Sequence, residues 1–164
     1  MVAKSAVSES SAADHLSTQR EVERAASVDV PVLVSAIQFN ERITYARLVH
    51  ACSDRSEHPF IELQCGSKHA AASTANELTL DVLAASFRDA RGGSLFIDDV
   101  GELSVTCQSW LCRQLSLQRL RQLETGRGVR LIAGSSGTLL DHVSIGRFDS
   151  YLFYRLNVIH IDRR

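Results

Sequence analysis

Residues 92–103 read GGSLFIDDVGEL, an apolar run that leads directly into two adjacent carboxylates. The residues at 95–97 form the continuous apolar run that is typical of a strand buried on both faces of a parallel sheet. Asp98 and Asp99 follow at its carboxyl end, the edge where α/β folds bind ligands. Carboxylates there are costly to desolvate unless they are paired or bound to a cation. The stretch therefore predicts either a magnesium–phosphate site or two acids that face solvent.

Strands and helices alternate on both sides of this stretch. Apolar, often β-branched runs predict further strands at 30–36, 60–65, 129–135 and 157–161. Helical spacing of apolar residues predicts helices at 17–27, 41–52, 77–90, 104–123 and 148–156. Residues 136–146 read as a loop with a helical turn. This alternation implies βαβ units, a parallel central sheet and a three-layer α/β fold.

Composition narrows the class of protein. A length of 164 residues, 45% of them hydrophobic and 23% charged, fits one folded domain, which we place at 17–164 after a disordered Ser/Ala-rich tail at 1–16. The net charge of −1 offers no basic field for direct DNA binding. We find neither a membrane-spanning run nor a signal peptide, and none of the four cysteines forms a C-x-x-C pair. We therefore expect a cytoplasmic protein with free thiols and no membrane contact.

Four collinear blocks resemble the AAA+ domain of sigma-54-dependent transcription activators. GGSLFIDDVGEL is similar to that family's GGTLFLDEIGEL, and VPVLVSA followed by ARLVH is similar to VPVLITG and ARAIH. HPFIELQC is similar to KPFVAVNC, while VRLIAGSS and GRFDSYLFYRLNVIHI are similar to VRLIAATN and GRFREDLYYRLNVVPI. The resemblance covers about residues 17–161 and implies a P-loop NTPase-like core. In the family, this domain binds ATP between the subunits of a ring and uses hydrolysis to remodel RNA polymerase bound to sigma-54.

The resemblance places the phosphate-binding loop at residues 35–44, SAIQFNERIT. Such a loop needs glycines, so that backbone amides cradle phosphates, and a lysine that reaches the outer phosphates. No glycine remains here, Glu41 adds a negative charge, and Arg42 replaces the lysine, for which arginine is a poor substitute at a tight site. Ile37 and Phe39 predict a loop that packs instead of cradling a ligand. The vestigial nucleotide-contacting positions are Ala36, Asn40, Glu41, Arg42 and Ile43.

The other positions implied by the resemblance are also altered. Asp98 matches the aspartate associated with magnesium, whereas Asp99 stands in place of a glutamate and is shorter by one methylene. Ser136 stands at the sensor position, where the family has asparagine. Asp149 replaces the first trans-acting arginine, and its charge would repel the γ-phosphate. Arg155 retains the second arginine, either as a vestige of that role or as a structural ion-pair partner.

Two further features of the family are missing from this sequence. The stretch between Phe60 and Gly92 contains nothing like GAFTGA, the loop that touches sigma-54, and neither a helical lid nor a DNA-binding motif follows the last strand. We therefore expect a degenerate, truncated core that uses no cofactor, is not an enzyme, and regulates transcription or signalling through a protein partner. That partner would be an activator, a kinase or the transcription machinery. The alternative is a residual ATP- and magnesium-binding domain with weak or no hydrolysis. The sequence favours no particular oligomeric state.

Overall fold

The computed structural model describes residues 17–66, 78–125 and 128–164, so the predicted tail at 1–16 lies outside the described residues. After a helix over residues 17–26, the strands are β1 (Val32–Ser35), β2 (Phe60–Gln64), β3 (Ser94–Asp98), β4 (Arg130–Ser135) and β5 (Ile159–Asp162). The helices are α2 (Phe39–Ala51), α3 (Leu80–Asp89), α4 (Val105–Thr125), α5 (Leu139–Ser144) and α6 (Ser150–Leu156). A single 3₁₀ turn, Val100–Glu102, follows β3.

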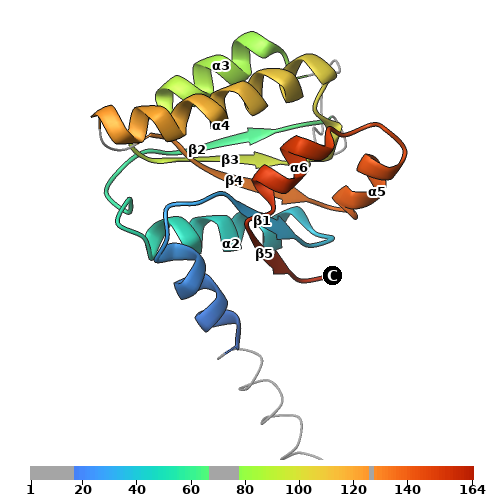
Figure 1. The fold of residues 1–164 in the computed structure, drawn as a ribbon. Coiled ribbons are helices and arrows are strands. Elements are labelled where there is room, and N and C mark those ends of the chain that lie inside the picture. Colours follow the sequence, from blue (N-terminus) through green and yellow to red (C-terminus); the bar gives the residue numbers. More distant parts are fainter. Residues whose placement is uncertain (1–16, 67–77, 126–127) are drawn as a thin grey trace, which may run out of the picture.

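The five strands form one parallel sheet in the order β2-β3-β4-β1-β5 (Figure 1). This confirms the predicted α/β class and the parallel sheet. The predicted strands and helices are all present, with bounds that differ from the expected ones by a few residues. The stretch at 136–146 contains the short helix α5, as the expected helical turn suggested.

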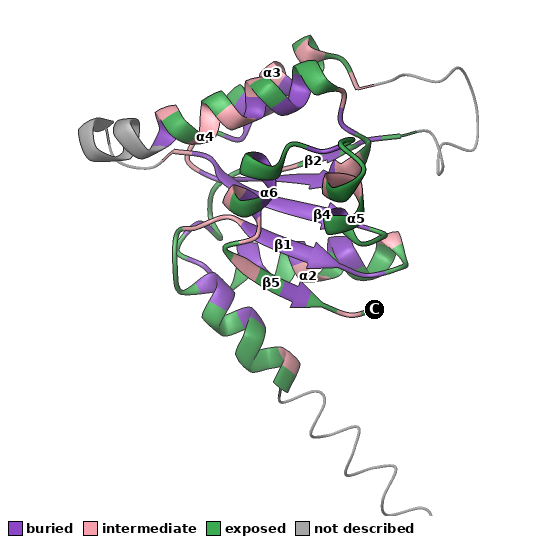
Figure 2. Cartoon of the chain, turned by 45° about the vertical axis from the view of Figure 1, so that its right-hand side comes forward, coloured by how far each residue is buried: buried purple, intermediate pink, exposed green. Residues whose placement is uncertain are grey.

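Helices cover both faces of the sheet, which gives the predicted three layers. On one face α3, α4, α5 and α6 pack against alternate strand residues, among them Leu33, Leu95, Ile97 and Leu131. On the other face, α2 and the helix over 17–26 pack against Val32, Val34, Phe96 and Ile132. All five residues of β3 are buried, as its continuous apolar run predicts for a central parallel strand (Figure 2).

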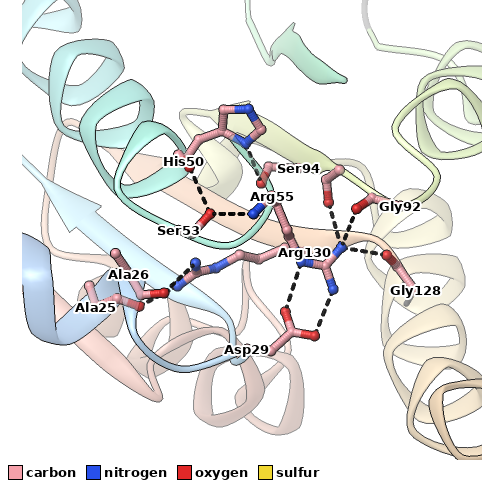
Figure 3. Close-up of polar contacts among 11 residues, drawn as sticks. Ala25, Ala26, Asp29, His50, Ser53, Arg55, Gly92, Ser94, Gly128 and Arg130 are labelled. Carbon is pink, nitrogen blue, oxygen red and sulfur yellow. Dashed lines mark hydrogen bonds and ion pairs between the residues drawn. The ribbon is translucent and has the colours of Figure 1, made fainter. Parts of the chain in front are cut away.

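A buried arginine joins the loops at the amino ends of the strands (Figure 3). Arg55 is 1% exposed, and it donates to both carboxylate oxygens of Asp29 at 3.1 and 2.6 Å. Its remaining terminal nitrogen donates to the backbone carbonyls of Gly92, Gly93 and Gly128. These contacts join the segments that lead into β1, β3 and β4. They therefore hold the amino ends of three neighbouring strands together.

We predict that Gly93→Ala destabilises the fold, because an added Cβ would lie 1.9 Å from the carbonyl oxygen of Pro59. That carbonyl accepts a hydrogen bond from Ser94 at 2.8 Å, so it is not free to move away. The free energy of unfolding in urea should fall by at least about 2 kcal/mol. Gly137→Ala is the control, because nothing lies within 4 Å of its added Cβ. Equal stability of the two variants would contradict the prediction.

Candidate functional site

The candidate site lies at the carboxyl edge of the sheet, where β1 turns into α2 beside the end of β3. Ala36 follows β1 directly, and α2 begins at Phe39 after an N-cap residue, Gln38, that makes no side-chain capping bond. This short connection places Arg42, in the first turns of α2, opposite Asp98 at the end of β3. The topology thus brings together side chains that are 56 positions apart in the sequence.

Arg42 is fully buried and forms the centre of the site. Its Nε donates to Oδ1 of Asp98 at 2.6 Å and its Nη2 to Oδ2 of Asp98 at 2.8 Å, a bidentate ion pair. Nη2 also donates to Asp99 at 3.3 Å. Nη1 donates to the carbonyl oxygens of Ala36 at 2.8 Å and Ile37 at 2.9 Å. Arginine has five N–H donors, so every one of them has an acceptor within the protein.

The charges around Arg42 keep it ionised. Burial acts to lower the pKa of Arg42, but the hydrogen bond and charge of Asp98, together with the charge of Asp99, raise that pKa above its usual value. The guanidinium is therefore a permanent cation that faces two carboxylates. Both oxygens of Asp98 are already occupied by this cation.

Asp99 links the arginine to the turn after β4. Its backbone is left-handed, with φ 47° and ψ 51°, a conformation that aspartate tolerates better than most residues. Its Oδ2 accepts from Arg42, and its Oδ1 accepts the backbone N–H of Ser136 at 2.8 Å. The predicted sensor residue Ser136 therefore lies at this edge, but its contact with Asp99 is made by the backbone, and the residue is exposed.

Gly134 leaves the space that Asp98 occupies, and the sequence analysis missed it. A Cβ at this position would lie 2.4 Å from Oδ1 of Asp98 and 3.1 Å from the ring of Phe96. The signal was present in the quoted motifs, because VRLIAGSS has glycine where VRLIAATN has alanine. Gly134 on β4 therefore leaves space for the carboxylate of Asp98, and Arg42 on α2 binds that carboxylate.

The other residues of the loop at 35–44 are either buried in the core or exposed to solvent. Ala36 is fully buried, and Ile43 packs into the core cluster beneath α2. Asn40 and Glu41 are exposed on the first turn of the helix. The negative charge of Glu41 consequently faces solvent and does not contact Asp98 or its partners.

The prediction that Ile37 and Phe39 both pack is half wrong. Phe39 is partly buried against the cluster under α2, as expected. Ile37 is 72% exposed, because its backbone carbonyl is turned inward to accept from Arg42. The loop is thus held by hydrogen bonds to the arginine more than by apolar packing.

The two positions of the trans-acting arginines lie on α6, outside the cluster around Arg42. Asp149 is the N-cap of α6, where its side chain accepts the N–H of Leu152 at 2.7 Å. Its own N–H is accepted by the buried Gln108 of α4 at 2.8 Å. The acid that replaces the first arginine therefore has a local structural use, which the sequence analysis missed even though aspartate before a helix is a recognised capping signal.

Arg155 does not have the carboxylate partner that one of its two expected roles required. Its Nη1 donates to the hydroxyl of Ser116 on α4, and its guanidinium lies 5.2 Å from the ring centre of Tyr151. Among the described residues, no ion pair with a carboxylate is formed by Arg155. The arginine is half-buried between α4 and α6.

The described part of the chain has neither a metal-binding cluster nor a membrane-spanning helix. Across residues 17–66, 78–125 and 128–164, no group of three or more His, Cys, Asp or Glu side chains is placed to hold a metal ion. Within the same ranges, every helix is too short or too polar to cross a membrane.

Comparison with known proteins identifies the relatives of this chain. The sequence model of the sigma-54 interaction domain matches residues 81–162. The transcriptional regulatory protein ZraR of Salmonella typhimurium strain LT2 is 30% identical over 155 residues, covering 87% of this chain and 35% of ZraR. The HTH-type transcriptional regulatory protein TyrR of Enterobacter agglomerans is 32% identical over 149 residues, covering 82% of this chain and 28% of TyrR. The chain thus spans about a third of the length of these curated relatives.

Solved structures confirm the fold. NtrX from Brucella abortus in complex with ATP superposes with a TM-score of 0.71 at 22% identity, covering 90% of this chain and 36% of NtrX. The P-loop NTPase domain of a sigma-54 activator from E. coli superposes with a TM-score of 0.63 at 21% identity, covering 88% of this chain and 98% of that domain. The parallel sheet and its helices therefore have the fold of a P-loop NTPase domain.

We predict that Arg42→Met lowers the free energy of unfolding by about 3–5 kcal/mol, because it leaves the buried carboxylate of Asp98 without its cation. Urea denaturation at pH 7 measures the change. Arg42→Lys keeps the charge but loses the planar fork, so its stability should lie between that of Arg42→Met and the parent chain.

The matched control is Arg47→Met, on the same helix. Arg47 forms an exposed ion pair with Glu62, and its loss should cost less than about 1 kcal/mol. The double variant Arg42→Met/Asp98→Leu should recover much of the stability, since both charges are then removed. If Arg42→Met were no less stable than Arg47→Met, the buried pair would not be a principal constraint on the fold.

We also predict that Asp149→Ala lowers the free energy of unfolding by about 1 kcal/mol, because α6 loses its N-cap. Asp149→Arg, which restores the residue of the family motif, should lose the same contribution. Asp149→Ser retains a capping oxygen and should remain close to the parent chain in urea denaturation. A loss in Asp149→Ser as large as that in Asp149→Ala would show that the cap is unimportant.

Proposed function

The chain belongs to the sigma-54 interaction domain family. We propose that it is a noncatalytic member of this family, which regulates transcription or signalling by protein contact. Its relatives include transcriptional activators. The observation that carries the proposal is the complete use of the Arg42 guanidinium inside the protein. A side chain with no donor left has none to offer to a phosphate.

The polarity of the loop is the reverse of what a phosphate needs. A phosphate-binding loop turns several backbone N–H groups inward, and these carry partial positive charge. Here the carbonyl oxygens of Ala36 and Ile37 point inward, toward Arg42. An anion that entered this space would meet two carbonyl oxygens and two carboxylates, and the cation there, Arg42, is already paired. The residues present therefore do not fit a magnesium nucleotide.

Arg42 instead serves the scaffold. It supplies, from within the chain, a positive charge against Asp98 and Asp99, so the edge of the sheet closes without a metal ion or a nucleotide. Packing and catalysis are separate requirements on a sequence, and a fold persists when only the second is lost. In this proposal the folded core acts by presenting its surface to another protein.

Helices α5 and α6 offer a surface of the right character for such contact. Four large apolar side chains are exposed there, namely Leu140, Ile145, Tyr151 and Tyr154. Tyrosine is enriched at protein–protein interfaces, and exposed apolar groups that gather on neighbouring elements often mark them. Figure 2 shows the exposed residues of α5 and α6 on one side of the molecule. This supports a protein partner, which we expect to be an activator, a kinase or the transcription machinery.

Isothermal titration of the full chain with ATP and magnesium tests the proposal. We predict no saturable heat, with a catalytically competent domain of the same family as the positive control. Clear binding at millimolar concentration or below would support the alternative, a residual nucleotide-binding domain.

A restored loop extends the same test. The variant carrying Ala36→Gly, Phe39→Gly, Glu41→Gly and Arg42→Lys should show no ATPase activity, because the positions of Asp99, Ser136 and Asp149 remain altered. Phosphate release is the readout, and circular dichroism checks that the variant folds. Turnover by this variant would contradict the view that catalysis was lost at several positions.

A further inference from the structure

A buried histidine lies at the amino edge of the sheet, the edge that Arg55 holds together. His50 is in the last turn of α2 and is 7% exposed. Its Nδ1 lies 2.9 Å from the hydroxyl oxygen of Ser94, the first residue of β3 (Figure 3). Its ring packs against Phe60, the first residue of β2, with 5.1 Å between the ring centres. The imidazole therefore joins the end of α2 to the beginnings of two strands.

Hydrogen bonds connect His50 to the contacts of Arg55. The hydroxyl of Ser53 donates to the backbone carbonyl of His50 at 2.7 Å and accepts the backbone N–H of Arg55 at 3.2 Å. The carbonyl of Gly93, which directly precedes β3, accepts from the guanidinium of Arg55 at 2.9 Å and from the backbone N–H of Arg130 at 3.0 Å. His50 and two buried arginines therefore belong to one network (Figure 3).

The charged groups that act on His50 are basic. They are Arg130 of β4, and Arg55 and His58 of the segment after α2. The carboxylates of this edge, Asp29 and Asp54, act on Arg130, and Asp29 is bound to Arg55. Burial is the largest influence on the pKa of His50 and lowers it below its usual value. A hydrogen bond with the backbone of His58 acts to raise that pKa, and the positive neighbours lower it.

The neutral ring is therefore the form that this part of the fold accommodates. A proton on His50 would place a third positive charge beside two buried guanidiniums, at the cost of desolvating it. The segment at 52–59 can relieve this cost by moving away from the sheet. It consists largely of turns, and only Ser53 and Arg55 in it are buried. Its departure would bring Arg55 and the protonated imidazole into contact with water.

We propose that His50 makes the amino edge of the sheet acid-sensitive, so that its protonation releases the segment at 52–59 from β3 and β4. The opposite edge stays closed, because the ion pair between Arg42 and Asp98 is untouched. Such local opening uses less free energy than global unfolding and is common for segments with few buried side chains. The inference does not rest on the proposed function, since none of the contacts around His50 involves the residues of the candidate site.

The direction of the pH dependence follows from the number of protons bound in each state. A histidine whose pKa is lowered in the closed state binds fewer protons there than in the open state, where its pKa is about 6.5. The closed state is therefore fully favoured above about pH 6.5 and loses stability as the pH falls below that value. Each pH unit of acidification in this range multiplies the opening constant by up to about ten.

Amide hydrogen exchange of the full chain, followed by nuclear magnetic resonance between about pH 7 and pH 5, tests the proposal. The reporter is the N–H of Ser94, which donates to the carbonyl of Pro59 at 2.8 Å. After correction for the intrinsic exchange rate, its protection should fall by up to about tenfold per pH unit. The internal control is the N–H of Cys65, which donates to the carbonyl of Asp98 at the other edge, and its protection should change by less than about twofold. Constant protection at Ser94, or equal losses at both amides, would overturn the proposal.

Two variants assign the effect to one side chain. His50→Gln retains hydrogen-bonding groups but takes up no proton, so protection of Ser94 should no longer depend on pH. His160→Gln is the matched control, because His160 also contacts a serine hydroxyl, that of Ser35 at 2.8 Å, and burial also lowers its pKa. This control should respond to pH as the parent chain does. A parent-like response in His50→Gln would refute the assignment.

A direct titration of the parent chain needs no variant. The resonance of the Cε1–H group of His50 should move with pH, and its midpoint should lie below about pH 6.5. A midpoint at or above that value would show that the neutral form is not favoured by the fold, and the proposal would fail even if His50→Gln did not fold.

Discussion

The buried ion pair between Arg42 and Asp98 is the constraint on which the carboxyl edge of this domain depends. A guanidinium that is fully buried must find acceptors for all of its donors, since each unpaired one is costly. Two carboxylates and two inward-turned carbonyls meet that requirement. Two further features belong to the same arrangement. The left-handed backbone of Asp99 directs its carboxylate toward Arg42, and the absence of a side chain at Gly134 leaves room for the carboxylate of Asp98.

A second arginine performs the corresponding task at the opposite edge of the sheet. Arg55 binds Asp29 and three carbonyls that precede neighbouring strands, whereas Arg42 binds groups that follow them. The parallel strands are consequently tied at both ends by planar cations with fixed fork geometry. These contacts are made by side chains of the chain itself, so the buried charges at both edges of the sheet are paired within the fold.

The two edges differ in what they leave for other molecules. At the carboxyl edge every donor of Arg42 is used, so the surface there is chemically closed. At the amino edge, Nε of Arg130 and Nε2 of Gln118 are buried without a hydrogen-bond partner. Large apolar side chains are exposed on α5 and α6, the surface on which the proposed protein contact relies.

The amino-acid sequence was enough to predict the parallel α/β class and the place of each strand and helix, because periodicity and strand ends are local properties of the chain; the family resemblance placed Asp98 and the loop at 35–44 in one site. Only the tertiary structure decided what these residues do. Arg42 and Asp98 are 56 positions apart, and the direction of the carbonyls of Ala36 and Ile37 is set by that contact. The cap made by Asp149 and the unpaired Nε of Arg130 likewise arise from packing between distant elements, since hydrogen-bond partners are chosen by position in space and not by spacing along the chain.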